Sequence, residues 1–153
     1  FLTMSNDTQK EISKLVNLNK DACEFYEEAK EKVDSVSIKQ TFSNLETLHR
    51  NVMTNLQQQL RIMGGDPEVD ETFGGDMAQL WANISASVSN DIDTTWVSHL
   101  EEAEDRCLHQ IQDIMKDEDI DASVKASLTK EAETLRQSHD FMKDLKDCMK
   151  KAA

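Results

Sequence analysis

The sequence predicts an all-α protein, a four-helix bundle with one long crossover that carries a short fifth helix. Residues that break helices are scarce, since the 153 residues include one proline and four glycines. Apolar residues recur at steps of three and four along four long segments, which is the spacing of one helix face. Short turns join these segments into two pairs, and residues 64–91 separate the pairs. We expect a single domain that spans residues 1–153.

The first helix is predicted over residues 6–33. Polar residues that can cap a helix N-terminus stand at positions 5–8. Asn19 and Tyr26 lie at the edge of its apolar stripe. The stripe consists of Leu15, Leu18, Ala22, Phe25, Ala29 and Val33.

The second helix is predicted over residues 36–63. Its end is marked by Gly64 and Gly65, and Pro67 reinforces this stop because it cannot continue a helix. Its stripe consists of Ile38, Leu45, Val52, Leu56, Leu60 and Met63.

The crossover that follows contains one loop and one short helix. Residues 64–76 hold all four glycines and the proline, so they form the longest loop. Residues 76–89 predict the short helix, and residues 89–93 combine a break with a helix cap. The apolar residues of this short helix are Met77, Leu80, Trp81 and Ile84.

Two further long helices complete the bundle, over residues 92–117 and 121–150. An acidic stretch at residues 117–121 is the tight turn between them. The stripe of the first is Trp96, Leu100, Cys107, Ile111, Ile114 and Met115. The stripe of the second is Val124, Leu128, Leu135, Met142, Leu145 and Met149.

The lengths of the connections predict how the helices are ordered in space. Short loops make antiparallel neighbours, whereas the long crossover lets the third long helix start at the same end as the second. This is the ferritin-like arrangement of four helices, as opposed to a simple up-and-down bundle.

Several polar residues face the inside of this predicted bundle. Successive residues on a helix are rotated by about 100°. His49, Glu104 and His139 each lie about 40° from a stripe residue of their own helix, and Glu46 lies at the flank of its stripe. His49 and Glu104 stand near the middle of their helices, and His139 stands a few residues past the middle of its own, so these polar residues fall close to one layer. Glu46-x-x-His49 is also the spacing with which ferritin-like bundles present a di-iron half-site.

Two interpretations of this layer remain open. The polar residues can satisfy one another by hydrogen bonds, with Asn19, Tyr26 or a water completing the set. Alternatively, Glu46, His49, Glu104 and His139 hold a metal, with iron, manganese or zinc as candidates. The sequence favours the hydrogen-bonded network, so no cofactor is expected.

Composition narrows the classes of partner. The net charge of −13 repels nucleic acid and anionic membrane surfaces, so neither is an expected partner. Three cysteines with no paired spacing indicate reduced thiols, and neither a signal peptide nor a membrane span is evident, so we expect a cytoplasmic protein. We therefore expect the chain to interact with another protein or with a second copy of itself.

Several stretches of this chain resemble an uncharacterised bacterial family of ferritin-like four-helix bundles, known mainly as a domain of unknown function. The resemblance covers nearly the whole chain and implies a ferritin-like fold, without bringing an established activity. It rests on Trp81 and on "LNKDACEFYEEAKEKVDSVSIKQTF" (18–42), "LRIMGGDPE" (60–68), "HLEEAED" (99–105) and "SHDFMKDLKD" (138–147).

The wider ferritin-like superfamily binds two irons with four carboxylates and two histidines. Here only Glu46 and His49 match a Glu-x-x-His pair, and Glu104 can match a single glutamate. Three positions before His139 stands Arg136, a fixed cation where the pattern has a carboxylate. We therefore expect a degenerate di-iron site in which Arg136 contacts Glu46, Glu101 or Glu104.

Together these observations predict a non-catalytic, acidic interaction or stress-associated module, with stress entering only by association with the superfamily. No nucleophile–base pair, phosphate-binding loop or cysteine metal motif is visible, so no catalytic residue is assigned. The alternative is an iron- or manganese-carboxylate redox protein that uses the four central residues.

Overall fold

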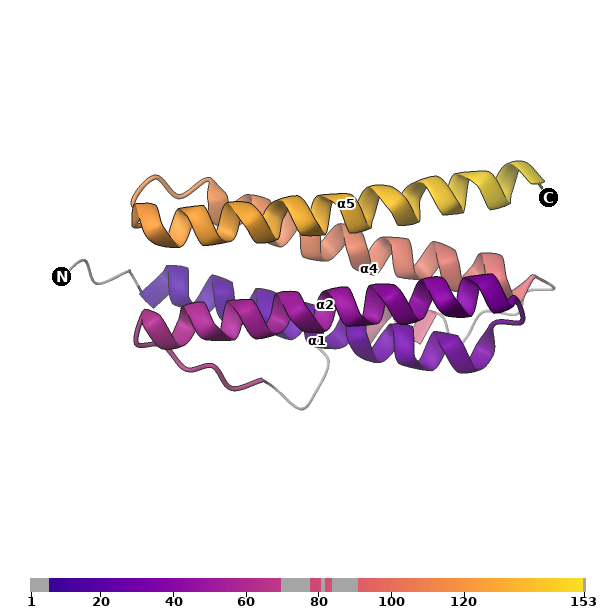
Figure 1. Ribbon diagram of the computed structural model, residues 1–153, viewed down its shortest axis with the longest axis horizontal. Coiled ribbons are helices and arrows are strands. Elements are labelled where there is room, and N and C mark those ends of the chain that lie inside the picture. The colour runs from indigo at the N-terminus through magenta and orange to yellow at the C-terminus, as the bar shows by residue number, and fades with distance from the viewer. Residues whose placement is uncertain (1–5, 70–77, 81, 84–90, 153) are drawn as a thin grey trace.

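The computed structural model describes residues 6–69, 78–80, 82–83 and 91–152, and within these ranges the chain forms helices and turns without any strand. The four long helices lie side by side along the molecule (Figure 1). They are α1 (Asn6–Lys32), α2 (Val36–Ile62), α4 (Ile92–Met115) and α5 (Ala122–Ala152). Each boundary lies within two residues of its predicted position, which confirms the all-α four-helix prediction.

The order of the helices in space is also as predicted. α1 and α2 form one antiparallel pair, and α4 and α5 form the other. α4 starts at the same end of the bundle as α2 and runs parallel to it, as the colour gradient in Figure 1 shows. α1 also packs against α4, whereas the seam between α2 and α5 is the least closely packed of the four.

The crossover is described in part. Residues 78–80 and 82–83 are helical, and Leu80 is buried against the apolar residues at one end of the bundle. The remainder of the short helix predicted over residues 76–89, including Trp81, lies outside the described residues.

Side chains tie the ends of the helices together. Ser35 is the N-cap of α2, since its hydroxyl accepts a hydrogen bond from the Ile38 amide at 3.3 Å. The carboxylate of Asp93, in the first turn of α4, accepts hydrogen bonds from the amides of Asp34 at 2.8 Å and Ser35 at 3.2 Å. The α1–α2 turn is therefore fixed to the start of α4.

The core of the bundle consists of two apolar clusters, one near each end. The first takes residues such as Leu15, Leu56, Ile111 and Leu128 from the four helices. The second takes Phe25, Phe42, Trp96, Leu100 and Met142 among others. On α2, α4 and α5 a buried polar residue stands between the two sets, namely His49, Glu104 and Ser138, and on α1 the buried Asn19 stands among the residues of the first set.

A glycine pair ends α2. Gly64 has φ +77°, and two hydrogen bonds close the end of the helix, from the Gly64 amide to the Arg61 carbonyl at 3.1 Å and from the Gly65 amide to the Leu60 carbonyl at 2.7 Å. This pair of bonds is the Schellman motif, which needs a residue in the left-handed conformation. The predicted stop of the second helix is confirmed, and its physical cause is the backbone of Gly64.

Gly64→Ala is expected to lower the free energy of unfolding by about 1–2 kcal/mol, because an L side chain is strained at this φ although nothing lies within 4 Å of the new Cβ. Urea denaturation of the variant would measure the loss. Gly65→Ala is the matched control, since Gly65 does not have a positive φ and its Cβ would meet the movable end of Gln9 at 3.2 Å. A loss at Gly65 as large as at Gly64 would contradict this explanation.

Candidate functional site

A buried histidine stands between the two apolar clusters. The His49 side chain is completely buried, and both of its ring nitrogens contact polar atoms. Nδ1 lies 2.7 Å from Asn19 Oδ1 on α1, and Nε2 lies 2.7 Å from Glu104 Oε1 on α4. His49 therefore links α2 to two other helices.

The partners of His49 determine where its protons are. Asn19 Nδ2 donates to the Leu15 carbonyl oxygen at 2.9 Å, so the Asn19 atom that faces His49 is an oxygen, which can only accept. Burial raises the pKa of Glu104, but the charge of His49 and the hydrogen bonds donated to the carboxylate outweigh it and hold this pKa below its ordinary value. Both ring nitrogens of His49 face acceptor oxygens, so a doubly protonated ring would satisfy both hydrogen bonds, and from this geometry we infer a buried imidazolium–carboxylate pair of His49 and Glu104.

Two hydroxyl groups complete the arrangement around Glu104. Tyr26 donates to Glu104 Oε1 at 2.6 Å, and Ser138 on α5 donates to the same oxygen at 2.8 Å. Burial, followed by the nearby charge of Glu104, raises the pKa of Tyr26 well above its ordinary value, so its hydroxyl remains a donor. The Tyr26 ring stacks on His49 with centroids 5.9 Å apart. We call the five residues the central network: Asn19, Tyr26, His49, Glu104 and Ser138.

The four residues predicted as metal ligands do not converge on one point. His49 and Glu104 meet in the central network, but Glu46 turns toward the edge of the bundle. Its Oε1 lies 2.9 Å from Lys30 Nζ, and its Oε2 lies 3.2 Å from an Arg50 guanidinium nitrogen. Two cations therefore neutralise Glu46 away from the other three.

His139 lies beside the central network and does not take part in it. Its side chain is 12% exposed, and Nε2 faces Asp105 Oδ1 at 3.0 Å and Glu101 Oε1 at 3.6 Å on α4. The polar residue that α5 contributes to the network is Ser138, which sequence reasoning missed. The buried positions of α5 alternate in steps of four and three (124, 128, 131, 135, 138 and 142), and this register could have identified Ser138.

The predicted role of Arg136 is wrong. Its guanidinium donates to Glu133 and Asp140 of the same helix, and the side chain is half exposed. From position 135, position 136 is rotated by about 100°, which places it beyond the stripe edge and within reach of the i−3 and i+4 carboxylates. The cation that neutralises the buried Glu104 is His49.

The central network does not fit a di-iron centre. Such a centre needs several carboxylates around the metal ions, whereas Glu104 is the one carboxylate among the described residues that takes part in the central network, although Asp21, Glu46 and Glu131 are also buried. His49 uses both ring nitrogens in hydrogen bonds, so neither is a free ligand atom. Glu104 Oε1 accepts three hydrogen bonds, whereas Glu104 Oε2 accepts none from the described residues.

A different set of potential ligands lies between α4 and α5. Glu101, Asp105 and His139 each offer one atom, and the three atoms lie within 4.8 Å of one another. We call them the α4–α5 triad. Among the residues that the structure describes, no other group of three histidine, cysteine or acidic side chains comes this close together.

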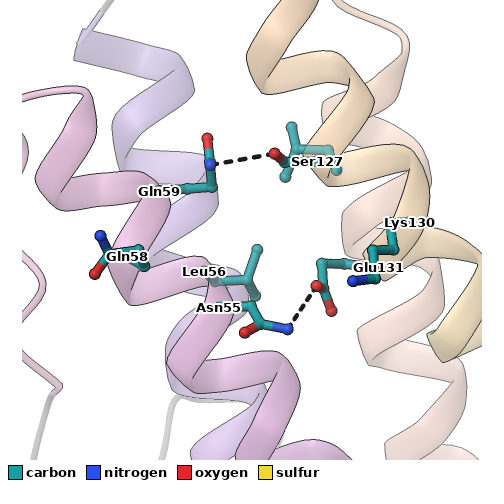
Figure 2. Close-up of a pocket in the computed structure, with 8 residues that line it drawn as sticks. Asn55, Leu56, Gln58, Gln59, Ser127, Lys130 and Glu131 are labelled. Atoms are coloured by element: carbon teal, nitrogen blue, oxygen red, sulfur yellow. Dashed lines mark hydrogen bonds between the residues drawn. The ribbon is translucent and has the colours of Figure 1, made fainter.

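A polar groove follows the loosely packed seam between α2 and α5. Figure 2 shows one part of it, with a volume of about 220 Å³, where Gln59 donates to Ser127 at 3.2 Å and Asn55 donates to Glu131 at 2.8 Å. A second part, of about 410 Å³, continues along the same helices and shares Asn55, Lys130 and Glu131 with the first. The groove is lined mainly by amides, hydroxyls and a few apolar side chains, together with the charged side chains of Lys130 and Glu131. We call it the α2–α5 groove.

The cysteines do not form disulfides, and two of them belong to the core. Cys23 and Cys107 are buried, whereas Cys148 is exposed. Burial raises the pKa of Cys23 to about 12 and that of Cys107 well above its ordinary value, so both buried thiols keep their protons. Within the described part of the chain, no helix has the length and apolar character needed to cross a membrane.

Comparison with known proteins yields one family and one solved structure. A family described as a domain of unknown function, DUF2383, matches residues 7–117. The fold resembles the crystal structure of a ferritin-like, diiron-carboxylate protein from Bacillus anthracis strain Ames, with a TM-score of 0.63. The sequences are 10% identical, and the alignment covers 97% of this chain and 99% of that one. No curated protein matches the chain.

Proposed function

Because the chain belongs to the DUF2383 family, whose members share a domain of unknown function, we propose a function from its own residues: this ferritin-like bundle acts without catalysis, by binding a protein partner. The observation that carries the proposal is the central network, in which a histidine and two hydroxyls all bind the carboxylate of Glu104. The layer that would house chemistry in a di-iron relative serves here to hold four helices together.

The proposed contact surface is the α2–α5 groove. Its lining extends from Asn44 to Gln59 along α2, which at about 1.5 Å per residue is enough for about four turns of a docked helix. Leu48 is partly exposed and supplies apolar surface, Val52 and Leu56 lie buried beneath the groove, and amide side chains supply both donors and acceptors.

The proposed occupant is an amphipathic helix of a positively charged partner. The net charge of −13 attracts such a segment over the whole surface and disfavours a second copy of this chain, nucleic acid and anionic membranes. Attraction of this kind raises the rate of encounter, and the groove would provide the specific contacts.

A metal-dependent redox function has weaker support. The alternative set of Glu46, His49, Glu104 and His139 is divided among three places: an ion cluster at Lys30, the central network and the α4–α5 triad. A role in the stress response is supported only by analogy with other proteins of this fold, and it does not help to identify the partner.

The test is an NMR titration of the isotope-labelled full chain with a synthetic cationic amphipathic helical peptide. The amides that shift are expected to map to the α2–α5 groove. Asn51→Arg adds a positive charge at an exposed groove position and is expected to weaken binding about tenfold, which is ~1.4 kcal/mol. Gln112→Arg, at an exposed position of α4, makes the same change of charge outside the groove and is expected to have little effect.

Three results would speak against this function. If the amide signals that shift belong only to α1 and α4, the contact surface lies on those helices and not in the α2–α5 groove. Equal weakening by the two arginine variants would reduce the binding to nonspecific attraction. Concentration-dependent sedimentation of the chain alone, with the same amides shifted, would replace the partner by a second copy.

A further inference from the structure

We propose that the α4–α5 triad of Glu101, Asp105 and His139 is a divalent transition-metal site, of which zinc is the best-fitting occupant. The site is separate from the central network and independent of the partner proposed above. It differs from the four central residues that the sequence suggested, of which it contains only His139.

The helices bring the three ligands together by simple geometry. Glu101 and Asp105 are four residues apart on α4, so their carboxylates lie on one face. His139 reaches them from α5, the antiparallel neighbour of α4. A site built from two packed helices is preorganised, because both backbones are held by the apolar clusters.

The two distances from His139 to the carboxylates are close to those expected for ligands of one metal ion, and all three donor atoms lie within 4.8 Å of one another. Zinc binds nitrogen at about 2.0–2.1 Å and carboxylate oxygen at about 2.0–2.2 Å, so two donors in tetrahedral coordination lie about 3.3–3.5 Å apart. His139 Nε2 lies 3.0 Å from Asp105 Oδ1 and 3.6 Å from Glu101 Oε1. Only small movements of the side chains would let all three bind one ion, with water as a fourth ligand.

The surroundings orient the ligands. His139 Nδ1 faces Asp140 Oδ1 at 3.1 Å, and a carboxylate at this nitrogen holds its proton there and leaves Nε2 to bind metal. Lys146 Nζ lies 3.4 Å from Glu101 Oε2, the oxygen that does not face His139. The side chains of Glu101 and His139 are 13% and 12% exposed, whereas that of Asp105 is 42% exposed, so an ion can enter from solution.

The ligand types select the class of ion. One imidazole with two carboxylates suits zinc, cobalt, iron and manganese, whereas magnesium and calcium prefer oxygen ligands alone. A bound ion would also neutralise two carboxylates that lie close together, so it would join α4 to α5.

The test is calorimetric titration of the EDTA-treated full chain with zinc chloride, together with the visible absorption of bound cobalt(II) as a report of coordination. One zinc per chain is expected. His139→Gln and Asp105→Asn are each expected to weaken binding by at least about a hundredfold, since even the loss of a partner such as Asp140 costs about 10–100-fold. Asp140→Asn should fall in that range.

Matched variants separate this site from the alternatives. Glu102→Gln and His99→Gln change the same residue types on α4 outside the triad and are expected to retain binding. Cys148→Ser removes the exposed thiol and is also expected to retain it. Retention of the site is likewise expected for Glu104→Gln, provided that circular dichroism shows the variant folded.

Four results would overturn the proposal. Zinc stoichiometry near zero would do so directly. Unchanged affinity in His139→Gln, or loss caused by Cys148→Ser, would place the zinc at another group. Loss in His109→Gln with His139→Gln unaffected would move the site to an exposed histidine, whose Nδ1 lies 3.5 Å from Asp105 Oδ2.

Discussion

Glu104→Leu is expected to lower the free energy of unfolding by about 3–5 kcal/mol, because it leaves a buried imidazolium and two buried hydroxyl donors without their acceptor. This is a large part of the stability of an ordinary domain, which is about 5–15 kcal/mol. Chemical denaturation in urea, followed by circular dichroism, would measure the change. Glu102→Leu on the exposed side of the same helix is the matched control and should stay within about 0.5 kcal/mol of the parent.

A second variant separates the charge from the packing. His49→Leu combined with Glu104→Leu removes both members of the ion pair, so no buried charge remains. The double variant is expected to be more stable than Glu104→Leu alone, since apolar side chains often replace a buried pair at little cost. The imidazolium–carboxylate assignment is wrong if the loss of stability in the double variant equals the sum of the losses in His49→Leu and Glu104→Leu measured singly. It is also wrong if Glu104→Leu melts like the parent.

Alkaline pH is expected to destabilise the protein steeply, by about 4 kcal/mol per pH unit between pH 10 and 11. Three buried groups that lose their protons at alkaline pH have raised pKa values: Cys23, at about 12, and Tyr26 and Cys107, well above their ordinary values. Below the ordinary values both the folded and unfolded states keep these protons, and stability is fully present. Above them the unfolded chain loses protons that the folded chain retains, at about 1.4 kcal/mol per group and pH unit.

Urea midpoints measured from pH 8 to pH 11 would test this slope. Cys107→Ala removes one of the three groups, so it should reduce the slope by about a third, whatever it costs in packing at neutral pH. Cys148→Ala, at the exposed thiol, is the control and is expected to keep the slope of the parent. An identical slope in Cys107→Ala would show that burial does not hold that proton.

The fold could be predicted because its signals are local and repeated. Apolar stripes define the four helices, Gly64 marks the end of one, and the long crossover sets the parallel order of α2 and α4. These features depend on a few neighbouring residues each, so the sequence expresses them directly.

The site could be predicted only in part, because it depends on small rotations. His49 and Glu104 lie well within the inward faces of their helices, so the sequence predicts both correctly. His139 and Ser138 lie on opposite sides of the α5 stripe, and about 100° of phase decides which one enters the centre. The sequence also does not say which of two nearby partners a charged side chain takes. It predicts a contact of Arg136 with Glu46 or with α4, whereas Arg136 pairs along its own helix.

The central network draws its members from both helical hairpins, and this has a consequence for cooperativity. The α1–α2 hairpin contributes Asn19, Tyr26 and His49, whereas α4–α5 contributes Glu104 and Ser138. Separating the hairpins would leave a cation on one and an anion on the other, each facing apolar surface. Partial opening along this plane is therefore disfavoured, so we expect the bundle to unfold as one cooperative unit and not as two stacked hairpins.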